Sequence, residues 1–241
     1  GIFWGAETNG IFENWEQANA SGIPNAAPGE INYVNHSIEY DEFGDPSDNQ
    51  VIDFDDYVKL GDPNPDFTFS IGSEFSYKNW DMSLLFTGQE GGDIFWVDSW
   101  QLSGLFRTRN HLSDSFDTSW KAPLSYLNGS VVYDPSVGNT IGVTNPAAII
   151  ENGNRNTPSD RQVFDGSFLR LKNINLGYNF NFKNGNSLRL YVSGQNLLTW
   201  TKYPGYDPEV RTYTRNPQKR GVDFGSYPGT KSYIFGLKLN Y

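Results

Sequence analysis

Residues 66–77 read DFTFSIGSEFSY, and large apolar side chains alternate there with small or polar ones. Successive side chains of a β-strand point to opposite faces, so this period of two predicts a strand with one apolar face. Its apolar set is Phe67, Phe69, Ile71, Phe75 and Tyr77. A tight connection at Lys78-Asn79 leads into a second alternating run, whose apolar members are Trp80, Met82, Leu84 and Phe86. The two runs together predict an antiparallel hairpin.

Three further segments, 168–180, 188–195 and 233–241, alternate in the same way. Asn184-Gly185, between the first two, is a strong hairpin signal because both residues accept the turn's positive φ angles. The alternation in 168–180 breaks phase, since Leu169 and Leu171 fall on the face opposite to that of Leu176. A β-bulge, or a strand that continues beyond a membrane, would explain this break.

The predicted connections are unequal in length. Short turns at 78–79 and 181–186 alternate with long segments at 89–166 and 198–230. Outer-membrane barrels combine short periplasmic turns with long external loops, whereas structureless loops of this length are uncommon in compact soluble domains. The sequence therefore predicts an all-β protein, an antiparallel transmembrane β-barrel. A soluble carbohydrate-binding β-sandwich is the alternative.

About five strands do not close a barrel, since the smallest closed ones have about eight. An open sheet edge in lipid would leave backbone groups unpaired at several kcal/mol each. The strands are therefore expected to pair with further strands of the same barrel and to contact membrane lipid. No apolar run approaches the ~20 residues of a membrane-spanning helix.

Composition excludes several classes of protein. The 241 residues include no cysteine, which rules out disulfides and thiolate metal sites. The net charge of −10 argues against nucleic-acid binding, which needs a basic face. No nucleophile–base arrangement, zinc-ligand spacing or phosphate-binding glycine loop stands out, so no enzyme is predicted. Aromatic residues make up 16% of the chain, which suits both barrel girdles and sugar-binding sandwiches.

Several short blocks resemble one family. They are GDPNPDF at 61–67, FLRLKN at 168–173, GQNLLTW at 194–200, YPGYDPE at 203–209 and DFGSYP at 223–228. In this order they resemble the C-terminal part of SusC/RagA-type TonB-dependent outer-membrane transporters. The resemblance implies the last strands of a ~22-stranded barrel, without its plug domain. Residues 1–65 would then be an extracellular loop region. Residues 66–241 would carry the strands and the extracellular loops 89–166 and 198–230.

The resemblance also implies a function and partners. It implies import of large nutrients, oligosaccharides or peptides, across the outer membrane of a Bacteroidota-type bacterium. A SusD-like surface lipoprotein would cap the barrel, and TonB would act through an N-terminal region outside these residues. The alternative within the same fold is a structural or secretion-associated barrel subunit of an envelope complex.

The acidic segment 41–56 resembles a calcium loop of the family. Its candidate ligands are Asp41, Asp45, Asp53 and Asp56, whose carboxylates are the oxygen ligands that Ca²⁺ prefers. A proline follows Asp45, and the Asp-Gly step that makes the sharp turn is missing. A solvated acidic loop is the alternative, and no other cofactor is expected.

Aromatic residues of the long loops are candidates for contact with substrate or lipoprotein. They are Trp96, Trp100, Trp200, Tyr203 and Tyr206, which could stack on pyranose rings. Alternatively they form the outer aromatic girdle or pack against the lipoprotein.

The last strand resembles the signal that the barrel-assembly machinery reads. Gly236, Leu239 and the terminal Tyr241 carry this resemblance. A strand with an apolar face and an exposed edge is a template for strand pairing. Any amphipathic edge strand is the alternative reading.

Overall fold

The computed structural model describes residues 1–36, 42–43, 51–103, 110–133, 143–147, 157–210, 216 and 219–241. These residues divide into two units, which are described separately. The sheet unit comprises 62–94 and 164–241 with Gly1, and the loop unit comprises 2–61 and 95–163. Most regular elements are strands, which confirms the all-β prediction.

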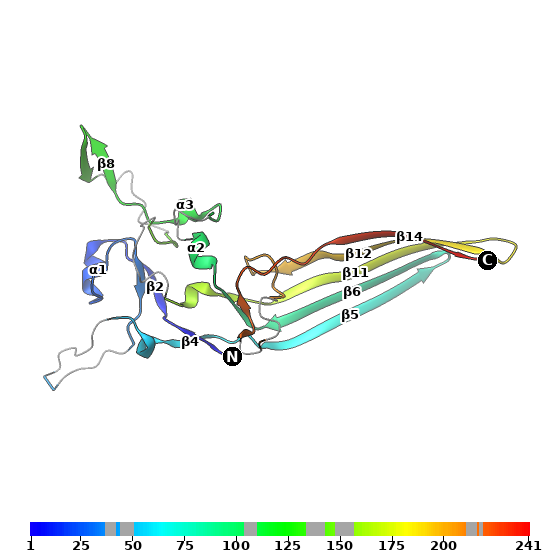
Figure 1. The fold of residues 1–241 in the computed structure, drawn as a ribbon, viewed down its shortest axis with the longest axis horizontal. Coiled ribbons are helices and arrows are strands. Elements are labelled where there is room, and N and C mark those ends of the chain that lie inside the picture. Colours follow the sequence, from blue (N-terminus) through cyan, green and yellow to red (C-terminus); the bar gives the residue numbers. More distant parts are fainter. Residues whose placement is uncertain are drawn as a thin grey trace. The chain divides into compact units, whose positions relative to one another are not determined.

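Five long strands form the body of the sheet unit. They are β5 (Pro65–Tyr77), β6 (Trp80–Gly91), β11 (Phe168–Asn181), β12 (Ser187–Thr201) and β14 (Ser232–Asn240). The sheet order is β14-β12-β11-β6-β5, with all neighbours antiparallel (Figure 1). Both predicted hairpins, β5–β6 and β11–β12, are confirmed. Their turns lie at the same end of the sheet as the C-terminus (Figure 1).

The phase break in the third strand is a β-bulge. The pairing of β11 shifts register between Leu171 and Asn173 on both sides, against β6 and against β12. Against β6, Lys172 is the one extra residue, and it returns Leu171 to the apolar face, where it lies opposite Phe86 and Leu198. Against β12, the extra residue is on β12, which has Asn196 and Leu197 opposite Lys172. Of the two explanations for the break in alternation, a β-bulge or a strand that continues beyond a membrane, the structure shows the β-bulge.

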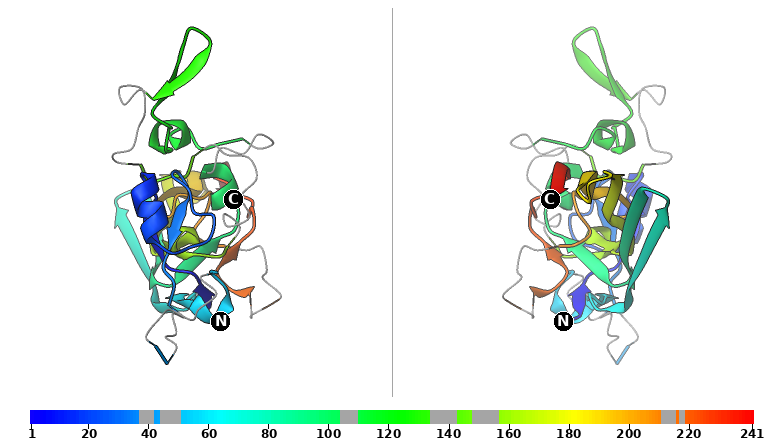
Figure 2. Two further views of the ribbon diagram at one scale, coloured as in Figure 1. Left: turned by 90° about the vertical axis from the view of Figure 1, so that its left-hand side faces the viewer. Right: turned by 90° about the vertical axis from the view of Figure 1, so that its right-hand side faces the viewer.

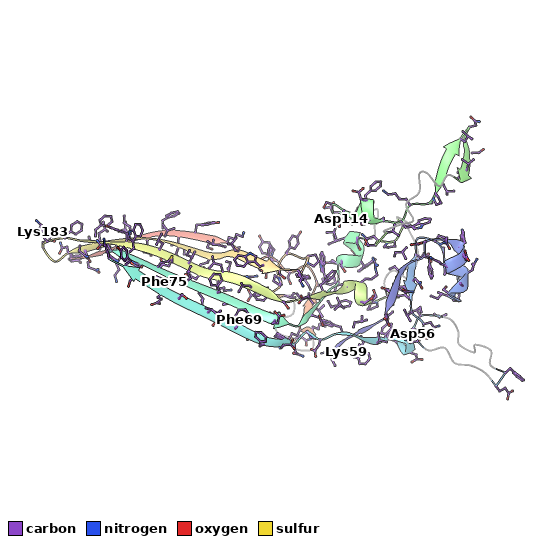
Figure 3. All side chains as sticks on the ribbon, turned by 180° about the vertical axis from the view of Figure 1, so that it is seen from behind. Asp56, Lys59, Phe69, Phe75, Asp114 and Lys183 are labelled. Atoms are coloured by element: carbon purple, nitrogen blue, oxygen red, sulfur yellow. The ribbon has the colours of Figure 1, made fainter. Side chains whose placement is uncertain are left out.

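The five strands present one continuous apolar face. Cross-strand neighbours in register share a face, and the apolar residues of all five strands meet in this way. Those that are more than a third exposed are Phe67, Ile71, Phe75, Tyr77, Trp80, Leu169, Leu176, Phe180, Leu190, Val192, Leu198, Trp200, Tyr233, Phe235, Leu237 and Leu239. Figure 3 shows Phe69 and Phe75 spaced along β5, and Lys183 in the turn at the far end. A soluble protein rarely leaves so large an apolar surface uncovered.

Two strands extend further than predicted. β6 continues to Gly91 and β12 to Thr201, beyond positions 89 and 198 where loops were expected to begin. In β12 the alternation runs on with unchanged parity past position 195, so Leu198 and Trp200 lie on the same apolar face as Leu190 and Val192. A three-stranded sheet of β10 (Val163–Asp165), β7 (Asp93–Trp96) and β13 (Val222–Asp223) also forms within the expected loops.

The loop unit consists of short elements. β1 (Phe3–Gly5) pairs with β4 (Val58–Gly61), β2 (Thr8–Ile11) with β3 (Ile31–Tyr33), and β8 (Leu124–Leu127) with β9 (Ser130–Tyr133). The helices are α1 (Trp15–Ala20), α2 (Ser99–Ser103) and α3 (Ser115–Thr118), with 3-10 turns η1 (Phe54–Asp56) and η3 (Asp160–Gln162). Phe12, Ala18 and Ala26 form a small core with Ile23, and Figure 2 shows the β8–β9 hairpin as a separate two-stranded element of this unit.

Within the described ranges, no helix is both long and apolar enough to cross a membrane. The assignment of 1–65, 89–166 and 198–230 to the extracellular side stays a prediction.

Candidate functional site

The face of the sheet opposite the apolar one carries polar and charged side chains. In its middle, Ser83, Asn175 and Ser193 lie in one cross-strand row on β6, β11 and β12. Ion pairs lie on either side of this row, one toward the short turns and one toward the long connections. A wall with water on one side and lipid on the other needs this separation of polar and apolar side chains.

The ion pair near the turns bridges two strands that are not neighbours. Asp81 on β6 and Arg189 on β12 reach one another across Gly177 of β11. Arg189 Nε donates to Asp81 Oδ1 at 3.1 Å, and Nη2 donates to Oδ2. Asn179 Nδ2 donates to the same Oδ1 at 2.9 Å. A Cβ at position 177 would lie 2.6 Å from Arg189 Nη2 and 2.7 Å from Asp81 Oδ2, so glycine leaves the room that this ion pair occupies.

A second glycine accommodates an aromatic ring on the terminal strand. Tyr191 of β12 is in register with Gly236 of β14, and a Cβ on Gly236 would lie 2.3 Å from Tyr191 Cζ. The ring therefore covers the glycine, with the Arg189 guanidinium 5.0 Å from the ring centroid. Asp81, Arg189 and Tyr191 thus form one connected row of side chains from β6 to β14. This packing gives Gly236 a physical role that its place in the assembly signal did not predict.

The ion pairs at the other end are built around Arg170, which is only 3% exposed. Its Nη2 donates to Asp207 Oδ1 at 2.6 Å, its Nη1 to Glu209 Oε2 at 2.5 Å and its Nε to Thr199 Oγ1 at 3.0 Å. Asp207 also accepts from the backbone N–H of Glu209, at 2.9 Å, and of Gly229, at 3.0 Å. Arg170 therefore holds Asp207 and Glu209, early in the connection between β12 and β14, against the sheet. Asp207 in turn holds Gly229, near the end of that connection.

The environment of Asp207 favours its charged form. Burial acts to raise the pKa of this carboxyl, but the hydrogen bonds from Arg170 and from two backbone N–H groups outweigh it and hold the pKa below its ordinary value. A depressed folded-state pKa contributes stability above the unfolded pKa of about 3.9. This contribution should be lost as the pH falls through the lower pKa of the folded state.

Arg170→Met should lower the free energy of unfolding by about 3 kcal/mol at neutral pH, because it leaves Asp207 buried without its counter-charge. The thermal midpoint of the purified protein in detergent measures the loss. Lys172→Met is the matched control, since Lys172 is a third exposed and 3.6 Å from Glu209, and should cost about 0–1 kcal/mol. Equal losses for the two variants would show that Arg170 is not the anchor of this connection.

The predicted aromatic candidates lie in different surroundings. Trp96 is buried, and Tyr203 is buried with its hydroxyl donating to Asp223 Oδ2 at 2.6 Å. Trp200 is on the apolar face opposite Leu169, as a girdle residue would be. Trp100 is half-buried, and Tyr206 is exposed. Contact of these rings with substrate or lipoprotein stays a prediction.

Only two of the four calcium candidates lie in the part of the chain that the structure describes. Asp41 and Asp45 lie outside the described residues. Asp53 and Asp56 form a capping box around η1, and the buried Asp56 carboxylate accepts from the backbone N–H of Asp53 and of His36. Within the part of the chain that the structure describes, no three acidic or histidine residues group as metal ligands. Calcium binding at 41–56 stays a prediction.

The assembly-signal residues all lie at the edge strand. Gly236 and Leu239 are in β14, and Tyr241 follows its last residue and is 100% exposed. The outer edges of β14 and β5 pair with no further strand among the described residues. Reading of Gly236, Leu239 and Tyr241 by an assembly machinery stays a prediction.

Sequence reasoning missed the Arg170 and Arg189 ion pairs. It also missed a cleft in the loop unit between Trp15 and Trp120, which are far apart in sequence. The one available signal was a charged residue inside an alternating strand, at positions 81, 170 and 189. Alternation marks the face of such a residue but does not identify its partner.

Comparison with known proteins places this geometry in a family. Over its whole length the chain is 33% identical to TonB-dependent receptor P3 of Formosa agariphila, and it covers 22% of that protein. It is 28% identical to TonB-dependent receptor SusC of Bacteroides thetaiotaomicron, over 87% of the chain and 19% of SusC. The chain belongs with the SusC/RagA-type TonB-dependent receptors. No protein-family model matches it.

A solved RagAB peptide transporter has the same fold as this receptor segment. The two superpose with a TM-score of 0.64 at 21% identity, over 99% of the chain and 22% of that transporter chain. SusC/RagA-type receptors are outer-membrane proteins, and so is this one. The relatives are receptors and transporters, which confirms the prediction that the protein is no enzyme.

Proposed function

We propose that the five-stranded sheet is part of the wall of a ~22-stranded transmembrane barrel, with its apolar face in lipid. The observation that carries the proposal is the uncovered apolar face, on which Phe235 is 79% exposed, backed by a polar face. Two open edges support it as well, because further strands can pair there. A carbohydrate-binding β-sandwich would bury the apolar face under a second sheet, and no described strand covers it.

The proposed activity is TonB-dependent import of large nutrients across the outer membrane. The names of the relatives, TonB-dependent receptor and peptide transporter, support import over a structural or secretion-associated role. In this proposal a SusD-like surface lipoprotein closes the barrel outside the cell. TonB delivers energy through a region N-terminal to these residues. The polar face of the sheet, with Ser83, Asn175 and Ser193, lines the conduit.

Uptake by cells tests this activity. Producing cells and cells that lack the gene are given fluorescent oligosaccharides of graded length and a fluorescent peptide mixture. One class of nutrient should accumulate only in producing cells, and an uncoupler of the proton gradient should abolish that accumulation. Uptake that survives the uncoupler would favour a passive barrel. Equal uptake by both cell types, with secretion defects after deletion, would favour the secretion-associated alternative.

A further inference from the structure

The loop unit contains a cleft of about 360 Å³, within the usual range of small-molecule sites. Its walls include the indoles of Trp15 and Trp120 and the rings of Pro28 and Pro123, with Glu13 and Asn14 beside them. Trp15 is 62% exposed, although it is one of the largest apolar side chains of this unit. An exposed indole beside a second indole and a carboxylate is an arrangement that the small core of the unit does not require.

Trp120 is held firmly in place. Its indole Nε1 donates to the backbone oxygen of Glu13 at 3.1 Å, and its backbone N–H donates to Asn145 O at 3.0 Å. A Cβ on Gly29, at φ +86°, would lie 2.7 Å from Trp120 Cε3, so the ring lies directly against the backbone there. The Trp120 indole is therefore a pre-positioned wall of the cleft beside Trp15, which lowers the entropy cost of binding a ligand in the cleft.

Hydrogen bonds also fix the Asn14 side chain and the Glu13 backbone beside the rings. Asn14 Oδ1 accepts from the backbone N–H of Gln17 at 2.9 Å, and Gln17 Oε1 accepts from the backbone N–H of Glu13 at 2.9 Å. Among the described residues, neither the Glu13 carboxylate nor the Asn14 Nδ2 has a hydrogen-bond partner. The cleft thus offers one strong acceptor and one donor next to aromatic surfaces.

This set of groups matches a neutral sugar. The C–H face of a pyranose ring packs on an indole, and its rim hydroxyls both donate and accept hydrogen bonds. A proline-rich peptide presents carbonyl oxygens and needs indole N–H donors, but that of Trp120 is already bonded to Glu13 O, which leaves only the N–H of Trp15. An acidic ligand would be repelled by Glu13 and by the net charge of −10.

We propose that the cleft between Trp15 and Trp120 binds a neutral oligosaccharide. One pyranose ring stacks on the indole of Trp15, and its hydroxyls bond to Glu13 and Asn14. The role of this site in nutrient capture rests on the proposed import function, and it narrows the class of imported nutrient to a glycan. The binding of a sugar in the cleft depends only on the geometry of the cleft.

Titration calorimetry on the purified full-length protein in detergent tests the site without transport. The probes are neutral hexasaccharides of glucose, xylose, mannose and galactose, and a proline-rich decapeptide. At least one hexasaccharide should bind, and Trp15→Ala should weaken that binding at least ten-fold. Glu13→Gln should weaken it several-fold, and Trp15→Phe should restore part of the loss. Trp4→Ala, which removes an exposed tryptophan outside the cleft, should leave binding unchanged.

Binding of no hexasaccharide at millimolar concentration would overturn the proposal. So would binding that Trp15→Ala leaves unchanged, or Trp15-dependent binding of the decapeptide instead. Hexasaccharide binding by the wild-type protein together with absent uptake by cells would refute import while leaving this site intact. The two proposals therefore fail in distinguishable ways.

Discussion

Leu84→Arg should lower the folding free energy of the barrel by about 2–4 kcal/mol, the cost of an arginine on the lipid face near the bilayer midplane. Leu84 lies in the middle of β6, opposite Ile174 on the apolar face of β11. A guanidinium there has neither water nor a counter-charge within the membrane. The fraction of folded protein, read from heat-modifiable gel mobility across a denaturant series, measures the loss.

Ser83→Arg is the matched control, because residue 83 is adjacent in the same strand and on the opposite face. An arginine at this position would face the polar side, in register with Glu74 of β5 and Asn175 of β11. It should cost less than about 1 kcal/mol, since lumen positions tolerate charge. Equal losses for Leu84→Arg and Ser83→Arg would contradict the assignment of lipid and lumen faces.

Gly236→Val should also have a large effect, because it removes the space that the Tyr191 ring occupies. A Cβ at 236 would lie 2.3 Å from Tyr191 Cζ and 2.4 Å from its hydroxyl oxygen, so the Tyr191 ring would have to move away from position 236. Overpacking of this kind costs about 1–3 kcal/mol. The ring would also lose its contact with Arg189. The amount of folded barrel in outer-membrane fractions should fall accordingly.

A double variant separates packing from signal recognition. In a Tyr191→Ala background, Gly236→Val should be nearly neutral, since the space over position 236 is then empty. If instead an assembly machinery reads Gly236 itself, the valine should reduce the folded barrel equally in both backgrounds. Among the described residues Tyr241 has no such packing partner, at 100% exposure, so its predicted role in assembly would depend on recognition or on membrane anchoring.

The strands were predictable because their signal is local. Side-chain alternation depends only on residues two apart, so both hairpins could be predicted from the sequence, and the phase break in 168–180 left a β-bulge as one of two explanations. The extension of β12 to Thr201 was not predicted, because Gly194 and Asn196 interrupt the run of apolar side chains on the face that Val192 shares with Leu198 and Trp200.

The site was less predictable because its contacts are remote in sequence. Asp81 and Arg189 are 108 positions apart and meet across an intervening strand, and Trp120 and Glu13 are 107 apart. Burial of Trp96 and Tyr203 depends on how the long connections fold on themselves, which no short-range pattern encodes. Neither Trp15 nor Trp120 belongs to a sequence motif, so only the structure shows that the two residues line one cleft.

The most direct test of the transmembrane sheet measures what each face contacts. Nitroxide labels are attached in turn to cysteines at Leu176 and Leu190 on the apolar face, and at Ser83 and Asn175 on the polar face, in protein reconstituted into lipid bilayers. Collision with oxygen, which concentrates in lipid, should dominate at the two leucine positions. Collision with a water-soluble nickel chelate should dominate at the other two. The same accessibility on both faces, or nickel-dominated collision at Leu176 and Leu190, would contradict a sheet whose apolar face lies in lipid.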